Sequence, residues 1–266
     1  MKRIGYSALT ALALATLAVS ANLASATPIA NGAVITTRIY NDCPSSTIST
    51  INSFPGTVAI NDDSLDCFGF ANRHAWSLSS DGGATPIAFD NRDMFTYCAT
   101  MVISGTTQGE AGLRLSPWWS PDNDGSFNVR TGDGEIACFG GRLPFYSFTG
   151  TYGLRYLKGT PIYLQIDYNP HNVSFLDPAT IVYTVRYNSV TYSSGPLAFD
   201  HGNPSEDPPH GVWGILTPAR AGGHMQALLT PAVKSNLRVD WLNICYDAGP
   251  TPANSTTWGK IKANYR

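Results

Sequence analysis

Polar and apolar residues alternate along several stretches of this chain, most clearly in 109–116, 126–130, 162–168 and 180–187. A period of two residues is that of a β-strand with one buried and one solvent-facing side. After residue 26, no stretch keeps the 3.6-residue apolar period of an amphipathic helix, so almost no helix is expected. Many short strands separated by turns predict an all-β fold, a sandwich or a barrel.

Turn sequences and shorter apolar stretches complete the strand prediction. Asp-Gly pairs in DNDG (122–125) and GDGE (132–135) supply the positive-φ residue that a tight hairpin needs. The further strands are expected within 75–79, 95–103, 134–141, 144–148, 211–216, 224–229 and 237–245.

The first 26 residues have the pattern of a secretory signal peptide. Lys2 and Arg3 precede an Ala/Leu-rich segment that ends in Ala24-Ser25-Ala26, a small-x-small cleavage pattern. No later stretch approaches the roughly 20 apolar residues of a membrane helix. We therefore expect no transmembrane segment and a secreted protein, extracellular or periplasmic after cleavage.

The remainder is predicted to hold one domain and a tail. Residues 27–247 contain no repeat and no internal linker, and their length suits a single β-sandwich. Residues 248–266 begin with a Pro/Thr/Ser-rich stretch, which predicts a flexible linker, and end in a short basic segment. That segment is either a frayed terminus or a tail that docks to export or envelope machinery.

Charge argues against nucleic acid as a partner. Residues 1–26 hold two of the 17 Lys and Arg and none of the 19 Asp and Glu, which leaves 15 against 19, a net charge of −4. Phosphate binding needs a clustered basic surface instead.

All five cysteines follow residue 26, in the part of the chain that export would expose to oxidising conditions. We predict a disulfide between Cys43 and Cys67, because both lie in polar loop sequence near the amino-terminal edge of the domain. Cys98 and Cys138 fall within apolar strands, so they either bridge neighbouring strands or stay buried thiols. The spacing contains no Cys-x-x-Cys pair and no Cys/His cluster, so no zinc site is expected.

The middle of the chain, about 95–216, resembles the concanavalin A-like or laminin-G-like jelly-roll superfamily. The resemblance lies in the order of GEAGLRLSPWW, DGSFNVRTGDGEIACFGG, YLKGTPIYLQIDY and ATIVYTVRY, and in their strand rhythm. It implies an antiparallel two-sheet jelly-roll β-sandwich with one concave sheet, and carbohydrate as the commonest ligand. The superfamily's hydrolases carry E-x-D-x-x-E or E-x-D-x-E, and its alginate lyases carry R-x-E-x-R and Q-I-H; none of these occurs here.

The predicted ligand site combines a polar sheet face with a tryptophan pair. Trp118 and Trp119 are adjacent, so within a strand they point to opposite sides: one is expected to anchor the core, the other to be exposed enough to stack on a sugar. The alternative is a buried anchor followed by a tight turn. The polar face can hydrogen-bond sugar hydroxyls or clamp a carboxylate, or it can hold only solvated cross-strand pairs. Its predicted members are Arg114, Arg130, Tyr163, Gln165 and Asp167.

No cofactor is expected. Asp122, Asn123 and Asp124 offer oxygens of the kind that calcium prefers, but no distal glutamate completes a loop, and a plain hairpin is favoured. The five histidines are scattered without ligand spacing.

Three functions remain open. The leading hypothesis is a secreted, non-catalytic β-sandwich that binds a polysaccharide or cell-envelope glycan. The alternative is a polysaccharide hydrolase or lyase in the groove of a concave sheet, with Tyr163 or His210 as base and Arg114 or Arg130 neutralising a substrate carboxylate. The third is an extracellular structural or assembly protein.

Overall fold

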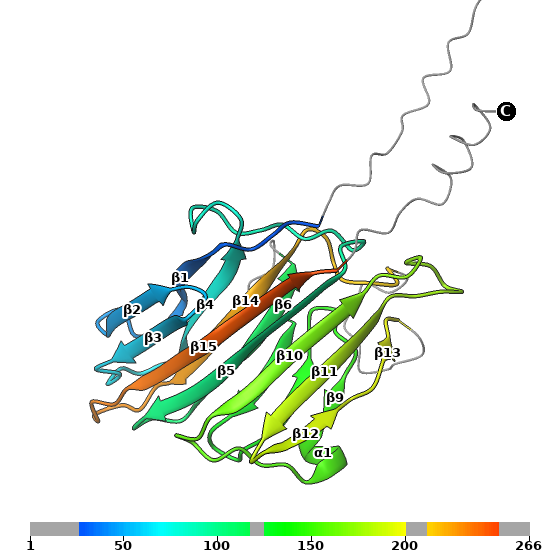
Figure 1. Ribbon diagram of the computed structural model, residues 1–266. Helices are drawn as coiled ribbons and strands as arrows, with labels where there is room; N and C mark the ends of the chain where they lie inside the picture. The colour runs from blue at the N-terminus through cyan, green and yellow to red at the C-terminus, as the bar shows by residue number, and fades with distance from the viewer. Residues whose placement is uncertain (1–26, 118–124, 201–211, 250–266) are drawn as a thin grey trace, which may run out of the picture. The chain divides into compact units, whose positions relative to one another are not determined.

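The computed structural model describes residues 27–117, 125–200 and 212–249, which belong to one compact unit spanning Ala26–Thr251 (Figure 1). These residues form two antiparallel sheets whose buried faces share one hydrophobic core. Sheet A has seven strands in the order β1 (Gly32–Asn41), β4 (Ala71–Ser79), β14 (Ala219–Leu228), β6 (Gly109–Pro117), β7 (Ser126–Arg130), β8 (Ile136–Phe139), β9 (Tyr146–Ser147).

Sheet B has eight strands, and its β15 runs between β5 and β3 in Figure 1. Its order is β12 (Val190–Ser193), β11 (Thr180–Tyr187), β10 (Ile162–Asn169), β5 (Phe95–Gly105), β15 (Leu237–Ala248), β3 (Thr57–Asp63), β2 (Thr47–Ser53), with β13 (Leu197–Ala198) pairing to β11.

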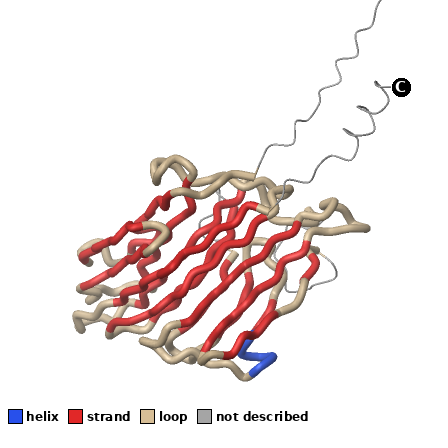
Figure 2. The backbone as a smooth tube through the Cα atoms, viewed as in Figure 1, coloured by secondary structure: helices blue, strands red, loops and turns tan. Residues whose placement is uncertain are grey.

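The predicted fold class is confirmed: the chain is an all-β, antiparallel two-sheet sandwich. The chain crosses between the sheets repeatedly, since β3, β5 and β15 belong to sheet B whereas β4, β6 and β14 belong to sheet A. This is the jelly-roll arrangement that the concanavalin A-like resemblance implies. In the part of the chain that is described, the one helix is α1 (Phe148–Tyr152), drawn blue in Figure 2.

Alternation along the strands decides which side chains enter the core. In β10, Ile162, Leu164 and Ile166 are fully buried, whereas the residues between them are half-buried and face outward. At the centre of the core Trp76 and Trp241 meet edge to face, with ring centroids 6.1 Å apart. Burial of these aromatic and branched side chains supplies most of the driving force for the sandwich.

Two strand predictions fail. The stretch 144–148 forms only the short β9 and then enters α1, because Ser147 caps the helix by accepting a hydrogen bond from the Gly150 N–H. Residues 212–216 form no strand. Strands β1, β2, β3 and β12 were not predicted. Of these, β2 is an edge strand that is almost entirely exposed and carries little apolar signal.

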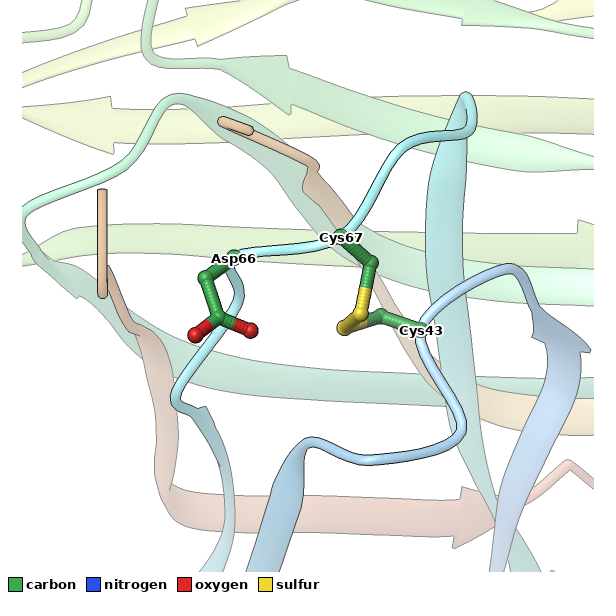
Figure 3. Close-up of side chains that lie close together, drawn as sticks. All are labelled: Cys43, Asp66 and Cys67. Carbon is green, nitrogen blue, oxygen red and sulfur yellow. A yellow bond between two sulfur atoms is a disulfide. The ribbon is translucent and has the colours of Figure 1, made fainter. Parts of the chain in front are cut away.

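The structure contains two disulfides. Cys43 and Cys67 are bonded as predicted, with an S–S distance of 2.03 Å (Figure 3). The second bridge joins Cys98 on β5 to Cys245 on the neighbouring strand β15. Of the two residues left open by the sequence, Cys98 is therefore bridged, whereas Cys138 is a free buried thiol whose pKa is raised well above its usual value by burial.

Several predictions concern residues outside the described part of the chain. They are the signal peptide (1–26), the basic tail, the tryptophan pair and the calcium-type loop 122–124. These stay predictions. No helix in the described part is long and apolar enough to cross a membrane.

Candidate functional site

The predicted polar face is divided between the two sheets. Tyr163, Gln165 and Asp167 lie on β10 and point away from the core on the outer face of sheet B. Arg114 on β6 and Arg130 on β7 point away from the core on the outer face of sheet A. The expectation that these residues share one face is therefore wrong, and each group has to be considered with its own neighbours.

On sheet A, Arg114 belongs to a group of polar side chains that we call the sheet A network. Strand pairing aligns Arg73 on β4 with Gln226 on β14, and Gln226 with Glu110 on β6. Two residues further along the same face, His224 on β14 aligns with Gly112 on β6, and Gly112 aligns with Asn128 on β7. The network consists of Arg73, Glu110, Arg114, Asn128, His224 and Gln226.

Hydrogen bonds connect the network across neighbouring strands. Arg73 Nη1 donates to Gln226 Oε1 at 3.1 Å, and Asn128 Nδ2 donates to Glu110 Oε2 at 2.9 Å. His224 Nε2 lies 3.1 Å from Asn128 Oδ1 across Gly112, whose missing side chain lets the two groups meet. Four strands are thus linked through side chains on a face that a two-layer sandwich turns away from its core.

The contact between His224 and Asn128 fixes the imidazole tautomer. Asn128 directs its amide nitrogen to the Glu110 carboxylate, so its oxygen faces the ring and accepts the proton of His224 Nε2. His224 Nδ1 is consequently the acceptor nitrogen. Among the described residues, no group donates a hydrogen bond to this buried atom.

Electrostatics keep His224 neutral. Its side chain is fully buried, and burial together with the charges of Arg73 and Arg114 lowers its pKa well below the usual value. Both arginines are themselves at most 7% exposed. The network thus contains two arginines, one neutral imidazole and one carboxylate, that of Glu110.

Arg130 differs from Arg114 although both project from the same face. Its guanidinium forms ion pairs with Asp133 at 2.9 Å and Glu135 at 2.7 Å, all three side chains being at least one-third exposed. Such exposed pairs within one hairpin contribute tenths of a kcal/mol, roughly 0.2–1. Arg130 therefore has a structural role within the β7–β8 hairpin.

The sheet B residues are hydrogen-bonded to one another along β10. The Tyr163 hydroxyl donates to Gln165, and Gln165 Nε2 donates to both Asp167 oxygens, at 2.9 and 2.8 Å. The Arg186 guanidinium lies 4.5 Å from the centre of the Tyr163 ring, a cation–π contact. Burial raises the pKa of Tyr163, against the effect of Arg186, so its hydroxyl is a hydrogen-bond donor and a poor base at neutral pH.

The described residues include one group with the spacing of metal ligands: Cys43, Asp66 and Cys67. Figure 3 shows the two sulfur atoms bonded to each other beside the Asp66 carboxyl group. A sulfur engaged in a disulfide is not a thiolate and does not serve as a ligand in this way. In the oxidised protein this group is therefore structural.

Sequence reasoning missed Arg73, His224 and Gln226. A signal was present in the stretch beginning HMQ, since His224 and Gln226 are two residues apart and therefore share a face of the predicted strand. No comparable signal exists for Arg73. All nine residues of β4 are buried, and both of its faces carry polar groups, so the strand does not alternate cleanly.

The chain matches no family model and no curated protein. Among solved structures it is similar to a family 7 alginate lyase in complex with a substrate, at 9% identity and a TM-score of 0.42, covering 75% of this chain and 81% of the lyase. It is also similar to arcelin-5, a lectin-like defense protein from Phaseolus vulgaris, at 15% identity and a TM-score of 0.39, covering 82% and 93%. A seed lectin from Lotus tetragonolobus matches at 11% identity and a TM-score of 0.38, covering 85% and 98%. Similarities this distant do not assign a ligand or a reaction.

Proposed function

We propose that the protein acts outside the cytoplasm and binds an acidic polysaccharide through the sheet A network. The observation that carries this proposal is a neutral His224 held between two nearly buried arginines on the outer face of a sheet. The two disulfides fit an exported protein, because such bonds persist in oxidising compartments.

Uronate sugars match the chemistry of this network. Arg binds carboxylates through a bidentate fork, and the network holds two guanidinium groups. Gln226 and Asn128 add amide groups of the kind that bind sugar hydroxyls. A uronate polymer offers a carboxylate on each sugar for such a fork to bind, and a neutral polysaccharide does not.

Binding of uronate oligomers by isothermal titration calorimetry tests the proposal, with neutral oligosaccharides of equal length for comparison. Arg114→Lys keeps the charge but loses the fork, and should weaken uronate binding about tenfold. Arg130→Lys on the same face is the matched control and should leave the affinity unchanged. Thermal melting verifies that each variant is folded. Equal affinity for neutral and uronate oligomers would refute the proposal.

A second candidate function, β-elimination of the bound uronate, would use His224 Nδ1, the buried acceptor nitrogen that no donor of the described residues reaches. A neutral imidazole can take the proton α to the carboxylate while arginine stabilises the developing negative charge. The bond to the glycosidic oxygen then breaks, the imidazolium returns its proton to that oxygen, and a double bond remains in the sugar. Ultraviolet absorbance of the unsaturated product measures this reaction. His224→Gln should abolish it while uronate binding persists; a protein that binds uronates without generating the absorbance is a binding protein only.

A further inference from the structure

A cavity of about 460 Å³ opens on the outer face of sheet B, away from the sheet A network. It lies where β10 and β15 end and β5 and β11 begin, and it is completed by residues of the connecting segments such as His171 and Pro196. Its volume falls within the range of small-molecule sites, roughly 300–1,000 Å³. The cavity is therefore large enough for one small organic ligand.

The lining of the cavity is acidic. It contains the carboxylates of Asp167 and Asp247, and no Lys or Arg is found among its described lining residues. The arginines elsewhere on this face are engaged: Arg186 covers the ring of Tyr163, and Arg238 forms an ion pair with Asp240 at 2.6 Å. The remaining basic side chain of the described lining, His171, lies 3.7 Å from Asp177, so no Lys or Arg of this lining compensates Asp167 or Asp247.

The two carboxylates are held differently. Asp167 is half-buried and fixed, because Thr96 Oγ1 donates to it at 2.7 Å and Gln165 donates to both of its oxygens. These donors carry no positive charge and therefore form no ion pair with Asp167. Asp247 is exposed, and no hydrogen bond or ion pair from a described residue reaches its carboxylate. One acid is thus preorganised and the other is available at the rim.

Strand pairing sets the distance between these acids. Thr96 on β5 pairs in register with Asp167 on one side and Asp247 on the other. With strands about 4.8 Å apart, the two backbones are separated by about 10 Å. No three His, Cys, Asp or Glu side chains of the described lining place ligand atoms within 4.8 Å of one another, so these side chains do not form a metal-binding cluster. Met94, Val182 and Pro196 contribute apolar lining instead, which suits an organic body.

We infer that this cavity binds a small organic cation bearing one or more primary ammonium groups. Asp167 accepts hydrogen bonds from one ammonium group at the floor, and Asp247 attracts a second positive charge at the rim. Outside the cell, this chemistry is offered both by deacetylated amino sugars of a glycan and by free polyamines. The site is separate from the sheet A network and does not depend on acidic polysaccharide binding.

Calorimetric titration of the full chain with a glucosamine oligomer, its N-acetylated counterpart and spermidine tests the inference. The glucosamine oligomer should bind, with an affinity that falls as salt is added, and the N-acetylated oligomer should not, because acetylation removes the charge. Binding of spermidine alone would support the cation site and identify a polyamine as its source. Equal binding of the acetylated oligomer, or no binding of any of the three, would overturn the inference.

Single substitutions locate the site. Asp167→Asn should lower the affinity about tenfold, because charge-assisted hydrogen bonds are lost. Asp247→Asn should lower it a few-fold, since an exposed charge contributes less; this variant removes no contact within the described protein and should fold normally. Asp240→Asn, on the same strand but outside the cavity, is the control. A loss with Asp240→Asn as large as that with Asp167→Asn would contradict the assignment.

Discussion

Asp62 links the two sheets from inside the sandwich. It lies on β3 of sheet B, and its Oδ2 is 2.9 Å from both His74 Nε2 and Asn72 Nδ2 on β4 of sheet A. The Arg38 N–H donates to His74 Nδ1 at 2.8 Å, so the ring proton sits on Nε2 and points at the carboxylate. Because Asp62, Asn72 and His74 are fully buried, this contact is a specific polar tie between the sheets.

The first prediction is acid lability centred on Asp62. Burial alone raises the pKa of Asp62, but hydrogen bonds from His74, Ser46 and Asn72 outweigh burial and lower the pKa. The stabilisation is therefore complete above the unfolded pKa of about 4, and it is lost as the pH falls through the folded pKa. Urea unfolding at neutral and acidic pH should show a decrease of the free energy of unfolding in this range.

Asp62→Asn isolates this effect. The variant should lose about 1–3 kcal/mol at neutral pH and show a flatter dependence of stability on pH, because the titrating group is gone. Asp63→Asn, at the adjacent exposed position on β3, serves as the control and should keep the wild-type slope. If the Asp62→Asn variant retained the wild-type slope, the acid lability would have another origin.

Gly223 is required by the packing of Trp76 against Trp241. A Cβ at this position would collide with Trp76 Nε1 and lie 2.8 Å from Trp241 Cε2, in the centre of the core. Gly223→Ala should therefore destabilise the fold by about 1–3 kcal/mol through overpacking. Thermal melting measures the loss. Gly132→Ala is the matched control, because nothing lies within 4 Å of a Cβ there, and its melting temperature should be close to that of wild type.

At the scale of elements, the two disulfides should differ in their contribution to stability. Cys43 and Cys67 are 24 residues apart in sequence, whereas Cys98 and Cys245 are 147 residues apart. Loop-closure entropy gives about 3.5 kcal/mol for the shorter loop and about 5 kcal/mol for the longer one. The Cys98→Ser/Cys245→Ser variant should thus unfold at lower denaturant than Cys43→Ser/Cys67→Ser. The reverse order would exclude loop length as the deciding factor.

The strands that sequence predicted well are those with one apolar and one polar face. The alternation in 162–168 and 180–187 identifies β10 and β11 and their buried residues, because a half-buried strand has to alternate. The stretch 212–216 is apolar but does not form a strand, because apolar composition alone does not specify backbone pairing. Edge strand β2 was not predicted because its residues are mostly exposed, and an exposed strand lacks the alternating apolar residues that mark a half-buried one.

Site prediction failed at a different step. Alternation indicates that Arg114 and Gln165 each lie on the polar side of a strand, and both do. It does not indicate which sheet each strand joins, and both sheets have an outer face. The crossovers between sheets that separate Arg114 from Gln165 depend on pairing between distant segments, which the period of one strand does not encode.

For the sandwich as a whole, the two proposed sites should act independently. They lie on opposite outer faces, separated by two layers of side chains and backbone with sheets about 10 Å apart. Arg114→Lys should weaken uronate binding and leave glucosamine binding unchanged, and Asp247→Asn should do the reverse. In the double variant, the loss of uronate affinity should equal that of Arg114→Lys alone and the loss of glucosamine affinity that of Asp247→Asn alone, each within about 0.5 kcal/mol by calorimetry. A larger deviation would reveal coupling through the core.

The positions of the last two strands determine when the sandwich can fold during synthesis of the chain. β14 lies between β4 and β6 in sheet A, and β15 lies between β5 and β3 in sheet B, as Figure 1 shows for β15. A nascent chain that has not yet supplied residues 219–248 consequently has both sheets split into halves with open edges. Such non-local pairing is slow to form. The sandwich can therefore close only after nearly the whole domain has been synthesised, because each sheet needs one of the final strands at its centre.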